Sequence, residues 1–178
     1  MPKKKHTFVP EKQTHYIKMK NKTIEIKLQS WLYEELSESD CTLVDLAKEA
    51  TFSSYSPYSK FSVGAALLLE NGTVVKGCNN ENAAYPVTLC AERTAIFSAQ
   101  AQYPNVPIVA LAVAARNMKG EFVVKPVTPC GSCRQVIAEQ EYRYGRSIRV
   151  LMVGEDEILI AESVKDILPL CFEEGDMK

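Results

Sequence analysis

The spacing of apolar residues predicts that helices and strands alternate along the chain from about residue 40 onward. Asp40 is placed to cap a first helix, whose apolar positions are three and four residues apart: Leu43, Leu46, Ala47 and Ala50. Residues 61–69 form an apolar run that predicts a buried strand. Asn71-Gly72 then provides the residues that a tight hairpin needs at positive φ, and residues 73–75 predict the returning strand.

The second half of the chain continues this alternation. Thr88 is placed to cap a helix with an apolar face made of Ala91, Ala95, Ile96 and Ala99. Residues 107–115 are apolar throughout, which is typical of a central strand covered on both faces. The other predicted elements are strands at 122–124, 147–153 and 158–160, a helix from about Cys133 towards Gln140, and a short helix at 163–168. This order predicts one α/β domain built as a three-layer sandwich.

Residues 1–36 differ from the rest and are predicted to form an N-terminal arm or extension beside a folded domain over residues 37–178. The lysine run at 3–5 is typical of a solvated terminus. Residues 23–28 alternate apolar and charged side chains, a pattern that fits either a half-exposed strand or an unstructured arm. We expect three apolar residues to pack the end of the arm onto the core or onto a partner chain: Trp31, Leu32 and Leu36.

Composition narrows the classes of function. The chain has 178 residues, of which 46% are hydrophobic, enough for one continuous core. Its 21 Lys+Arg and 22 Asp+Glu produce no basic field, so we expect a small, weakly charged ligand and no nucleic acid. Six cysteines without a preceding secretory segment favour a reducing, cytoplasmic location. No apolar run approaches the length of a membrane span, so no membrane partner is expected.

Two short motifs carry candidate metal chemistry. Cys90-Ala91-Glu92 and Pro129-Cys130-Gly131-Ser132-Cys133 together offer three thiols and one carboxylate near two predicted helix starts. Three cysteines can hold zinc, leave a fourth position open for water, and station Glu92 beside that water as a proton carrier. A pair Cys-x-x-Cys alone also occurs in redox dithiols and structural zinc sites. The third cysteine, and the position of both histidines, His6 and His15, in the polar arm, favour a site with three protein ligands.

The charge of such a site requires compensation. Three thiolates around a divalent ion carry a formal charge of minus one, which opposes lowering the pKa of a bound water. Helix N-termini favour thiolates, and Arg93 and Arg134 are placed to donate hydrogen bonds to sulfur. The alternative for each arginine is a surface ion pair, and Glu92 could instead simply favour a helix start.

Four ordered blocks extend these motifs: residues 55–66, 77–86, 90–95 and 129–136. The second and fourth blocks begin Gly77-Cys78-Asn79-Asn80-Glu81 and Pro129-Cys130-Gly131-Ser132-Cys133. Together the blocks resemble the small, homotetrameric cytidine deaminases, and the three-cysteine motif with its glutamate meets the nucleobase deaminase signature. The similarity spans about residue 40 to the end and implies an α/β/α sandwich with a mixed central sheet.

The resemblance also implies a role for each matching residue. Cys90, Cys130 and Cys133 would bind one zinc ion per subunit, and Glu92 would shuttle protons. The implied substrate-binding residues are Asn79 and Glu81 for the ribose, Phe61 for the base, Ala91 near the metal, Ala83 and Tyr85 reaching a neighbouring subunit, and Phe172 stacking across an interface. Arg93 would neutralise thiolate charge. Two features depart from the family: Thr88 replaces a smaller residue, and the arm exceeds the usual N-terminus.

The implied reaction is hydrolytic deamination of cytidine and 2′-deoxycytidine to uridine and 2′-deoxyuridine, with release of ammonia in pyrimidine salvage. Three alternatives remain at this stage. The substrate could be a modified or drug-like nucleoside, the protein could edit nucleic acid through a basic, aromatic-rich channel, or it could be a zinc-binding module without catalysis.

Overall fold

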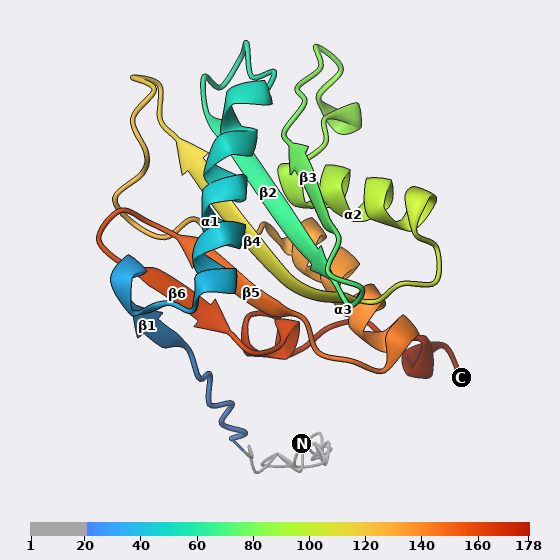
Figure 1. The fold of residues 1–178 in the computed structure, drawn as a ribbon. Coiled ribbons are helices and arrows are strands. Elements are labelled where there is room, and N and C mark those ends of the chain that lie inside the picture. The colour runs from blue at the N-terminus through green and yellow to red at the C-terminus, as the bar shows by residue number, and fades with distance from the viewer. Residues whose placement is uncertain (1–20) are drawn as a thin grey trace, which may run out of the picture.

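The structure is a computed structural model that describes residues 21–178. It contains a six-stranded sheet and three α-helices (Figure 1). The strands are β1 (Gln29–Trp31), β2 (Ser62–Leu69), β3 (Val74–Cys78), β4 (Ile108–Arg116), β5 (Arg149–Val153) and β6 (Ile158–Ala161). The helices are α1 (Glu38–Ala50), α2 (Ala91–Gln102) and α3 (Gly131–Tyr144). Five short 3-10 turns connect them: η1 (Tyr33–Glu35), η2 (Thr51–Ser53), η3 (Tyr85–Val87), η4 (Val164–Asp166) and η5 (Glu174–Met177).

The sheet is mixed. Its strand order is β1-β6-β5-β4-β2-β3; β4 and β5 are parallel, and the other neighbours are antiparallel. The predicted hairpin is confirmed, because β2 pairs with β3 and Gly72 between them has a φ of 82°.

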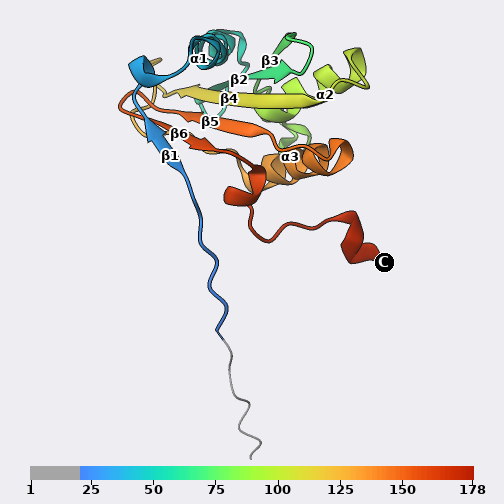
Figure 2. The same ribbon diagram turned by 60° about the horizontal axis from the view of Figure 1, so that its bottom comes forward.

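Helices cover both faces of the sheet, which confirms the predicted three-layer sandwich. Ala110, Ala112 and Ala114 of β4 pack in one core with α1, whereas Leu111 and Val113 pack in the other core with α2 and α3. This alternation explains why the sequence of β4 is apolar throughout. Figure 2 shows α1 on one side of the sheet and α3 on the opposite side.

Some element boundaries differ from the predictions. Ser37, and not Asp40, caps α1, because the Ser37 hydroxyl accepts a hydrogen bond from the Asp40 amide. Asp40 is buried and forms a two-pronged ion pair with Arg149 of β5, with both N–O distances at 3.1 Å. The predicted strand at 122–124 is reduced to an isolated bridge between Phe122 and Arg116, and the predicted helix at 163–168 to the turn η4.

The N-terminal segment enters the sheet later than the pattern suggested. Residues 21–28 form no helix or strand and extend away from the body (Figure 2). Pairing starts at Gln29, where β1 joins β6 as an edge strand. Of the three apolar residues expected to pack the arm, Leu36 contacts the α1 core, while Trp31 and Leu32 remain exposed. The lysine run at 3–5 and both histidines lie outside the described residues.

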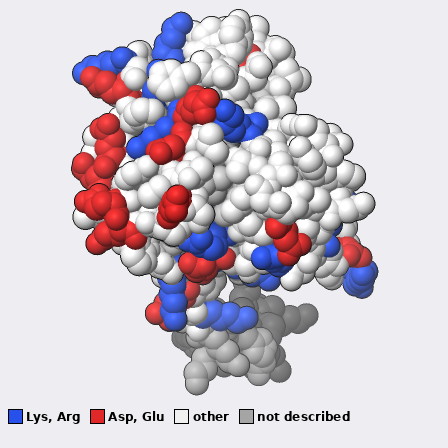
Figure 3. All heavy atoms as spheres, in the orientation of Figure 1, with Lys and Arg blue, Asp and Glu red and all other residues white. Residues whose placement is uncertain are grey.

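The described surface carries charges of both signs. Figure 3 shows both basic and acidic groups on one face, with a wide uncharged area beside them, and the whole chain has a net charge of −1. Within residues 21–178, no helix is long and apolar enough to cross a membrane.

Candidate metal centre and active site

Three cysteines converge where two helices begin. Cys90 is the residue that flanks the start of α2, Cys130 flanks the start of α3, and Cys133 lies in the first turn of α3. Because both helices pack on the same face of the sheet, their N-termini bring distant parts of the sequence together. The helix start falls at Cys90 rather than at the predicted cap, Thr88, whose hydroxyl instead accepts a hydrogen bond from the Asn82 amide at 3.1 Å.

The distances between the sulfurs fit a zinc site. Cys130 Sγ lies 3.8 Å from Cys90 Sγ and 3.5 Å from Cys133 Sγ, and all three sulfurs lie within 4.8 Å of one another. Tetrahedral zinc with Zn–S bonds of about 2.3 Å places its sulfurs about 3.8 Å apart. Within the part of the chain that the structure describes, this trio is the group of side chains arranged to hold a metal. No fourth protein ligand joins the trio there, so the donor set leaves one position for water or substrate.

Glu92 lies beside this centre in the first turn of α2 and exposes only 4% of its surface. Burial raises the pKa of the Glu92 carboxyl above its ordinary value, and the charge of Cys90 raises it further. A raised pKa makes the protonated form of a carboxyl easier to reach, so that the group can both accept and return a proton. This is the property that a general acid and base needs.

Arg93 is the cation that contacts the centre. Its Nη2 lies 3.6 Å from Cys90 Sγ and 3.3 Å from the Thr88 carbonyl oxygen. Hydrogen bonds from Cys133 and from Arg93 lower the pKa of the Cys90 thiol to about 5. The pKa of Cys133 is raised instead, because its proton is engaged by Cys90 and the group is buried. The contact with Arg93 therefore favours thiolate at Cys90.

Arg134 behaves differently from the expectation. Its Nε donates to the Pro129 carbonyl at 2.8 Å and its Nη1 to the Ile167 carbonyl at 2.7 Å. Both contacts are to backbone oxygens, because the side chain extends from α3 towards the loop before it and the segment after η4. Arg134 thus fixes the turn that carries Cys130 and does not donate to sulfur among the contacts of the described residues.

Asn79 is part of the scaffold as well as a candidate ligand for substrate. Its Oδ1 accepts hydrogen bonds from Ser54 Oγ at 2.5 Å and the Val63 amide at 2.8 Å, and its Nδ2 donates to the Phe61 carbonyl at 2.9 Å. One amide hydrogen is left for a ligand. The hydrogen bond from Ser54 to Asn79 could not be predicted from the sequence, because only the fold brings these two residues together.

The Glu81 side chain is anchored to the backbone through one of its two carboxylate oxygens. Its Oε2 accepts the backbone amides of Tyr58 at 2.9 Å and Ser59 at 3.2 Å. Hydrogen bonds from the Ser59 side chain and from both amides lower the pKa of Glu81, so the group is a carboxylate at neutral pH. Neither amide engages Oε1, which makes this oxygen a candidate acceptor for a hydroxyl group of a ligand.

The remaining candidate substrate residues fall into two groups. Ala91 is fully buried in the first turn of α2, and Phe61 is half-buried just before β2. Ala83, Tyr85 and Phe172 lie on the surface, with Tyr85 69% and Phe172 60% exposed. Tyr85 contacts only the edge of Tyr58 among aromatic rings, at 5.8 Å between centroids. The described subunit therefore leaves these three unburied.

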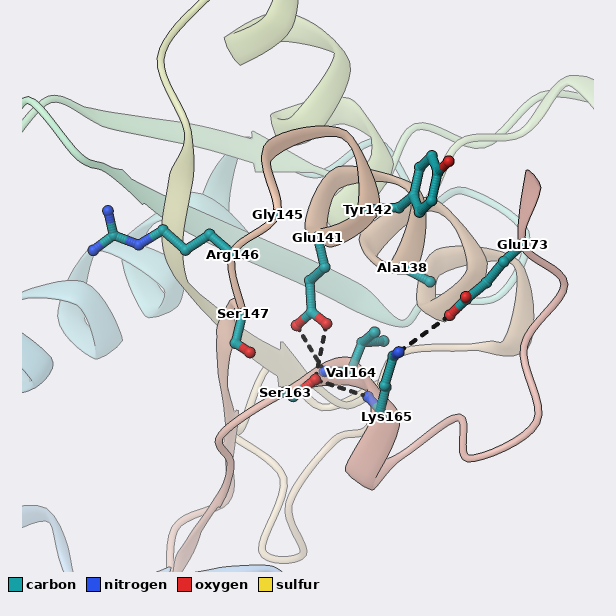
Figure 4. A pocket seen from close by; sticks show the side chains of 10 residues that line it. All are labelled: Ala138, Glu141, Tyr142, Gly145, Arg146, Ser147, Ser163, Val164, Lys165 and Glu173. Carbon is teal, nitrogen blue, oxygen red and sulfur yellow. Dashed lines mark hydrogen bonds and ion pairs between the residues drawn. The ribbon is translucent and has the colours of Figure 1, made fainter. Parts of the chain in front are cut away.

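A separate hollow of about 290 Å³ lies at the end of α3 (Figure 4). Its buried carboxylate, Glu141, accepts hydrogen bonds from the amides of Ile148 and Val164 and from the Ser163 hydroxyl. Lys165, on its rim, pairs with Glu173 at 3.3 Å. Glu141 thus ties η4 and the residue just before β5 to α3, and none of the three cysteines lines the hollow.

Comparison with known proteins agrees with this site. Residues 37–145, more than half of the 178-residue chain, match the family described as the cytidine and deoxycytidylate deaminase zinc-binding region. The chain belongs to this deaminase family. Family membership makes the protein a zinc-dependent deaminase, and the three cysteines fit the metal that the family description names.

Individual members of the deaminase family are similar over most of the chain. A cytidine deaminase from Sporosarcina psychrophila is 54% identical over 135 residues, which cover 76% of this chain and 92% of the relative. One from Mycobacterium tuberculosis is 38% identical over 136 residues, or 74% of this chain and 87% of the relative. The crystal structure of the Burkholderia pseudomallei cytidine deaminase, 38% identical, superposes with a TM-score of 0.64 and covers 77% of this chain and 100% of its own. This similarity confirms the predicted α/β/α deaminase fold.

Proposed function

We propose that the protein catalyses the hydrolytic deamination of cytidine and 2′-deoxycytidine to uridine and 2′-deoxyuridine, releasing ammonia in pyrimidine salvage. The observation that carries this proposal is the trio of thiols within 4.8 Å, with Glu92 buried in the adjoining helical turn. The similarity to relatives named cytidine deaminase supports the choice of substrate.

The residues of the chain have separate tasks in this reaction. Cys90, Cys130 and Cys133 would hold one zinc ion per subunit, which when bound supplies a water activated for attack on carbon. The Glu92 carboxylate would accept one proton from this water and donate it to N3 of the cytosine. It would then take the second proton, from the hydroxyl added at C4, and donate it to the amine that leaves as ammonia. Arg93 offsets the negative charge of the thiolates, which otherwise works against loss of that proton.

Recognition of the sugar follows from Glu81 and Asn79. Oε1 of Glu81, which neither backbone amide engages, would accept a ribose hydroxyl, and the remaining amide hydrogen of Asn79 would donate to one. Phe61, whose backbone is tied to Asn79, lines the space for the base, and Ala91 borders it in the first turn of α2. A site with unpaired polar groups of this kind favours a nucleoside over the free base.

We also propose a homotetramer with shared active sites, working in the cytoplasm. Ala83, Tyr85 and Phe172 are exposed in the single subunit, where they can reach the site of a neighbouring subunit in an assembly. Reduced cysteines are required for zinc thiolates, which favours a reducing compartment. The near-neutral charge of −1 supports a nucleoside rather than a polynucleotide as substrate.

The test combines metal analysis with turnover. Purified protein should contain about one zinc per subunit and should convert cytidine to uridine, followed by loss of cytidine absorbance and by ammonia release. The Glu92→Gln variant keeps the size and most hydrogen bonds of the side chain, so it should retain zinc and fold but lose at least about 10²–10⁴-fold in turnover. Near-full activity in Glu92→Gln would contradict the proton-transfer role. Zinc without ammonia release from any pyrimidine nucleoside would instead indicate a non-catalytic zinc module.

A further inference from the structure

The segment before β1 presents an apolar face that the other described residues leave exposed. Ile24, Ile26 and Leu28 expose 50%, 54% and 42% of their surfaces. In an extended backbone, side chains alternate between two sides, so these three lie together, opposite Glu25 and Lys27. This is the alternation of a half-buried strand, yet the segment pairs with no strand of the described chain.

The sheet explains why the segment stays unpaired. In the antiparallel register of β1 and β6, Gln29 is opposite Ile160, so Leu28 would be opposite Ala161. β6 ends at Ala161, and the chain then turns into η4. The residues before Leu28 therefore run past the end of β6, and no strand of the described residues lies beside them, which leaves their backbone free to pair with a second chain.

We propose that residues 23–29 pair with the same residues of a second copy of this chain, as antiparallel strands centred on Ile26. In this register Ile26 lies directly opposite Ile26 of the other copy, and Ile24 lies directly opposite Leu28 of the other copy. Glu25 of each copy lies directly opposite Lys27 of the other copy, so the two-fold symmetry produces two such ion pairs. The apolar side chains of both strands then share one face, which buries the surface that the single subunit exposes.

Neighbouring registers are unfavourable. A shift of one residue places charged residues opposite apolar ones and puts the two apolar sets on opposite faces. A shift of two residues in one direction places Glu25 opposite Glu25, and in the other direction Lys27 opposite Lys27. Like charges directly opposite each other destabilise a strand pair. The sequence thus selects the register centred on Ile26, and this pairing does not depend on the proposed enzymatic function.

Cysteine cross-linking of the full-length chain tests the pairing. Directly opposite residues in an antiparallel pair have Cα atoms about 4.5–5.5 Å apart, within the range that a disulfide spans. The Ile26→Cys protein should form a covalent dimer in a glutathione redox buffer, resolved on a non-reducing gel. The Ile24→Cys protein is the matched control, because its two cysteines would lie about 14 Å apart.

Ile26→Cys should cross-link at least about ten-fold faster than Ile24→Cys or Leu28→Cys alone, given the steep geometric requirement of a disulfide. A mixture of the Ile24→Cys and Leu28→Cys proteins should cross-link as heterodimers. The wild-type chain supplies the background from its six native cysteines. Equal rates for Ile26→Cys and Ile24→Cys would overturn the proposal.

Charge reversal provides an independent test of the register. In the Ile26→Cys protein, Glu25→Lys or Lys27→Glu alone places like charges opposite each other and should slow cross-linking, more so at low salt. The combined Glu25→Lys and Lys27→Glu change restores opposite charges and should restore the rate. A combined variant as slow as the single ones would show that the segment binds another surface.

Discussion

Arg93 and Arg134 are close to the starts of α2 and α3, but their guanidinium groups have different partners. Arg93 contacts Cys90 Sγ, whereas Arg134 contacts only the carbonyls of Pro129 and Ile167 among the described residues. We therefore predict that Arg93→Ala weakens zinc binding and turnover by about 10–100-fold, as loss of a hydrogen bond to a metal ligand does. Chelator competition and cytidine turnover measure this effect, and Arg93→Lys should recover part of it.

Arg134→Ala is the matched control for the charge. The substitution removes the same positive charge near the same centre. The hydrogen bonds that it removes, however, go to backbone carbonyl oxygens and not to a cysteine sulfur. It should lower the melting temperature while changing zinc affinity less than Arg93→Ala does. Equal losses of zinc affinity in both variants would mean that net charge alone, and not the contact with Cys90, sets the state of the thiolates.

Asn79 joins the loop at Ser54 to the start of β2 through three hydrogen bonds. Asn79→Ala would leave the Val63 amide and the Phe61 carbonyl without their partner, which costs roughly 1–3 kcal/mol for buried groups. We predict a loss of this size in the free energy of unfolding without substrate, measured by denaturant titration.

A substitution at Glu81 is the control for Asn79→Ala, because it should affect substrate binding and not stability. Glu81 accepts hydrogen bonds from the amides of Tyr58 and Ser59, and Glu81→Gln keeps an oxygen that can accept them. This variant should change stability little and raise the KM for cytidine. If Asn79→Ala left stability unchanged, its hydrogen bonds would not contribute to the scaffold as inferred.

At the scale of elements, Gly77 sets how closely β3 and α2 approach. A Cβ on Gly77 would lie 2.5 Å from the Ala95 amide nitrogen and 2.6 Å from the Ala91 carbonyl oxygen, both backbone atoms of α2. Gly77→Ala must therefore shift the helix that carries Glu92 and follows Cys90. We predict a destabilisation of about 1–3 kcal/mol, typical of overpacking, together with reduced turnover because the site loses its geometry.

Gly175→Ala is the control for this change, because an added Cβ there meets no atom within 4 Å. Thermal unfolding and cytidine turnover of the two variants should separate close packing from a general effect of replacing glycine. If Gly77→Ala unfolded with the same free energy as the wild-type protein, α2 would be able to move away from β3 without loss of stability.

The elements predicted best from sequence are those with long periodic patterns. The apolar spacing of α2 and the continuous apolar run of β4 identified both correctly, because burial of those faces against the sheet outweighs local alternatives. Helix starts were predicted less well. Asp40 and Thr88 are both good capping residues, but Asp40 pairs with Arg149 and Thr88 binds Asn82, contacts that only the tertiary structure creates.

The same contrast applies to the site and the arm. The cysteine spacing predicted the metal trio, because ligand types and intervals are properties of the sequence. The partners of Arg134 depend on where the chain after η4 passes, which no local pattern encodes. Residues 23–28 have the alternation of a strand, but a strand requires a neighbour, and β6 ends too early to provide one.

At the scale of the whole molecule, the proposed shared sites make a distinctive prediction for mixed assemblies. Phe172 is 60% exposed, and its carbonyl is tied to the Gln135 side chain at 2.7 Å, so the ring projects from a held backbone. If this ring completes the site of a neighbouring subunit, Phe172→Ala should raise the KM for cytidine and lower turnover. Glu92→Gln should abolish turnover in its own subunit.

Co-expression of the two variants should then produce some sites with wild-type activity, which neither homogeneous protein contains. A site is intact when Glu92 comes from a Phe172→Ala subunit and Phe172 comes from a Glu92→Gln subunit. Random assembly of equal amounts makes about a quarter of the sites intact under cyclic sharing between subunits. Cytidine turnover of the purified mixture should therefore exceed the mean of the two variants measured separately. Activity equal to that mean would show that Phe172 acts only within its own subunit, and the proposed sharing through this residue would be wrong.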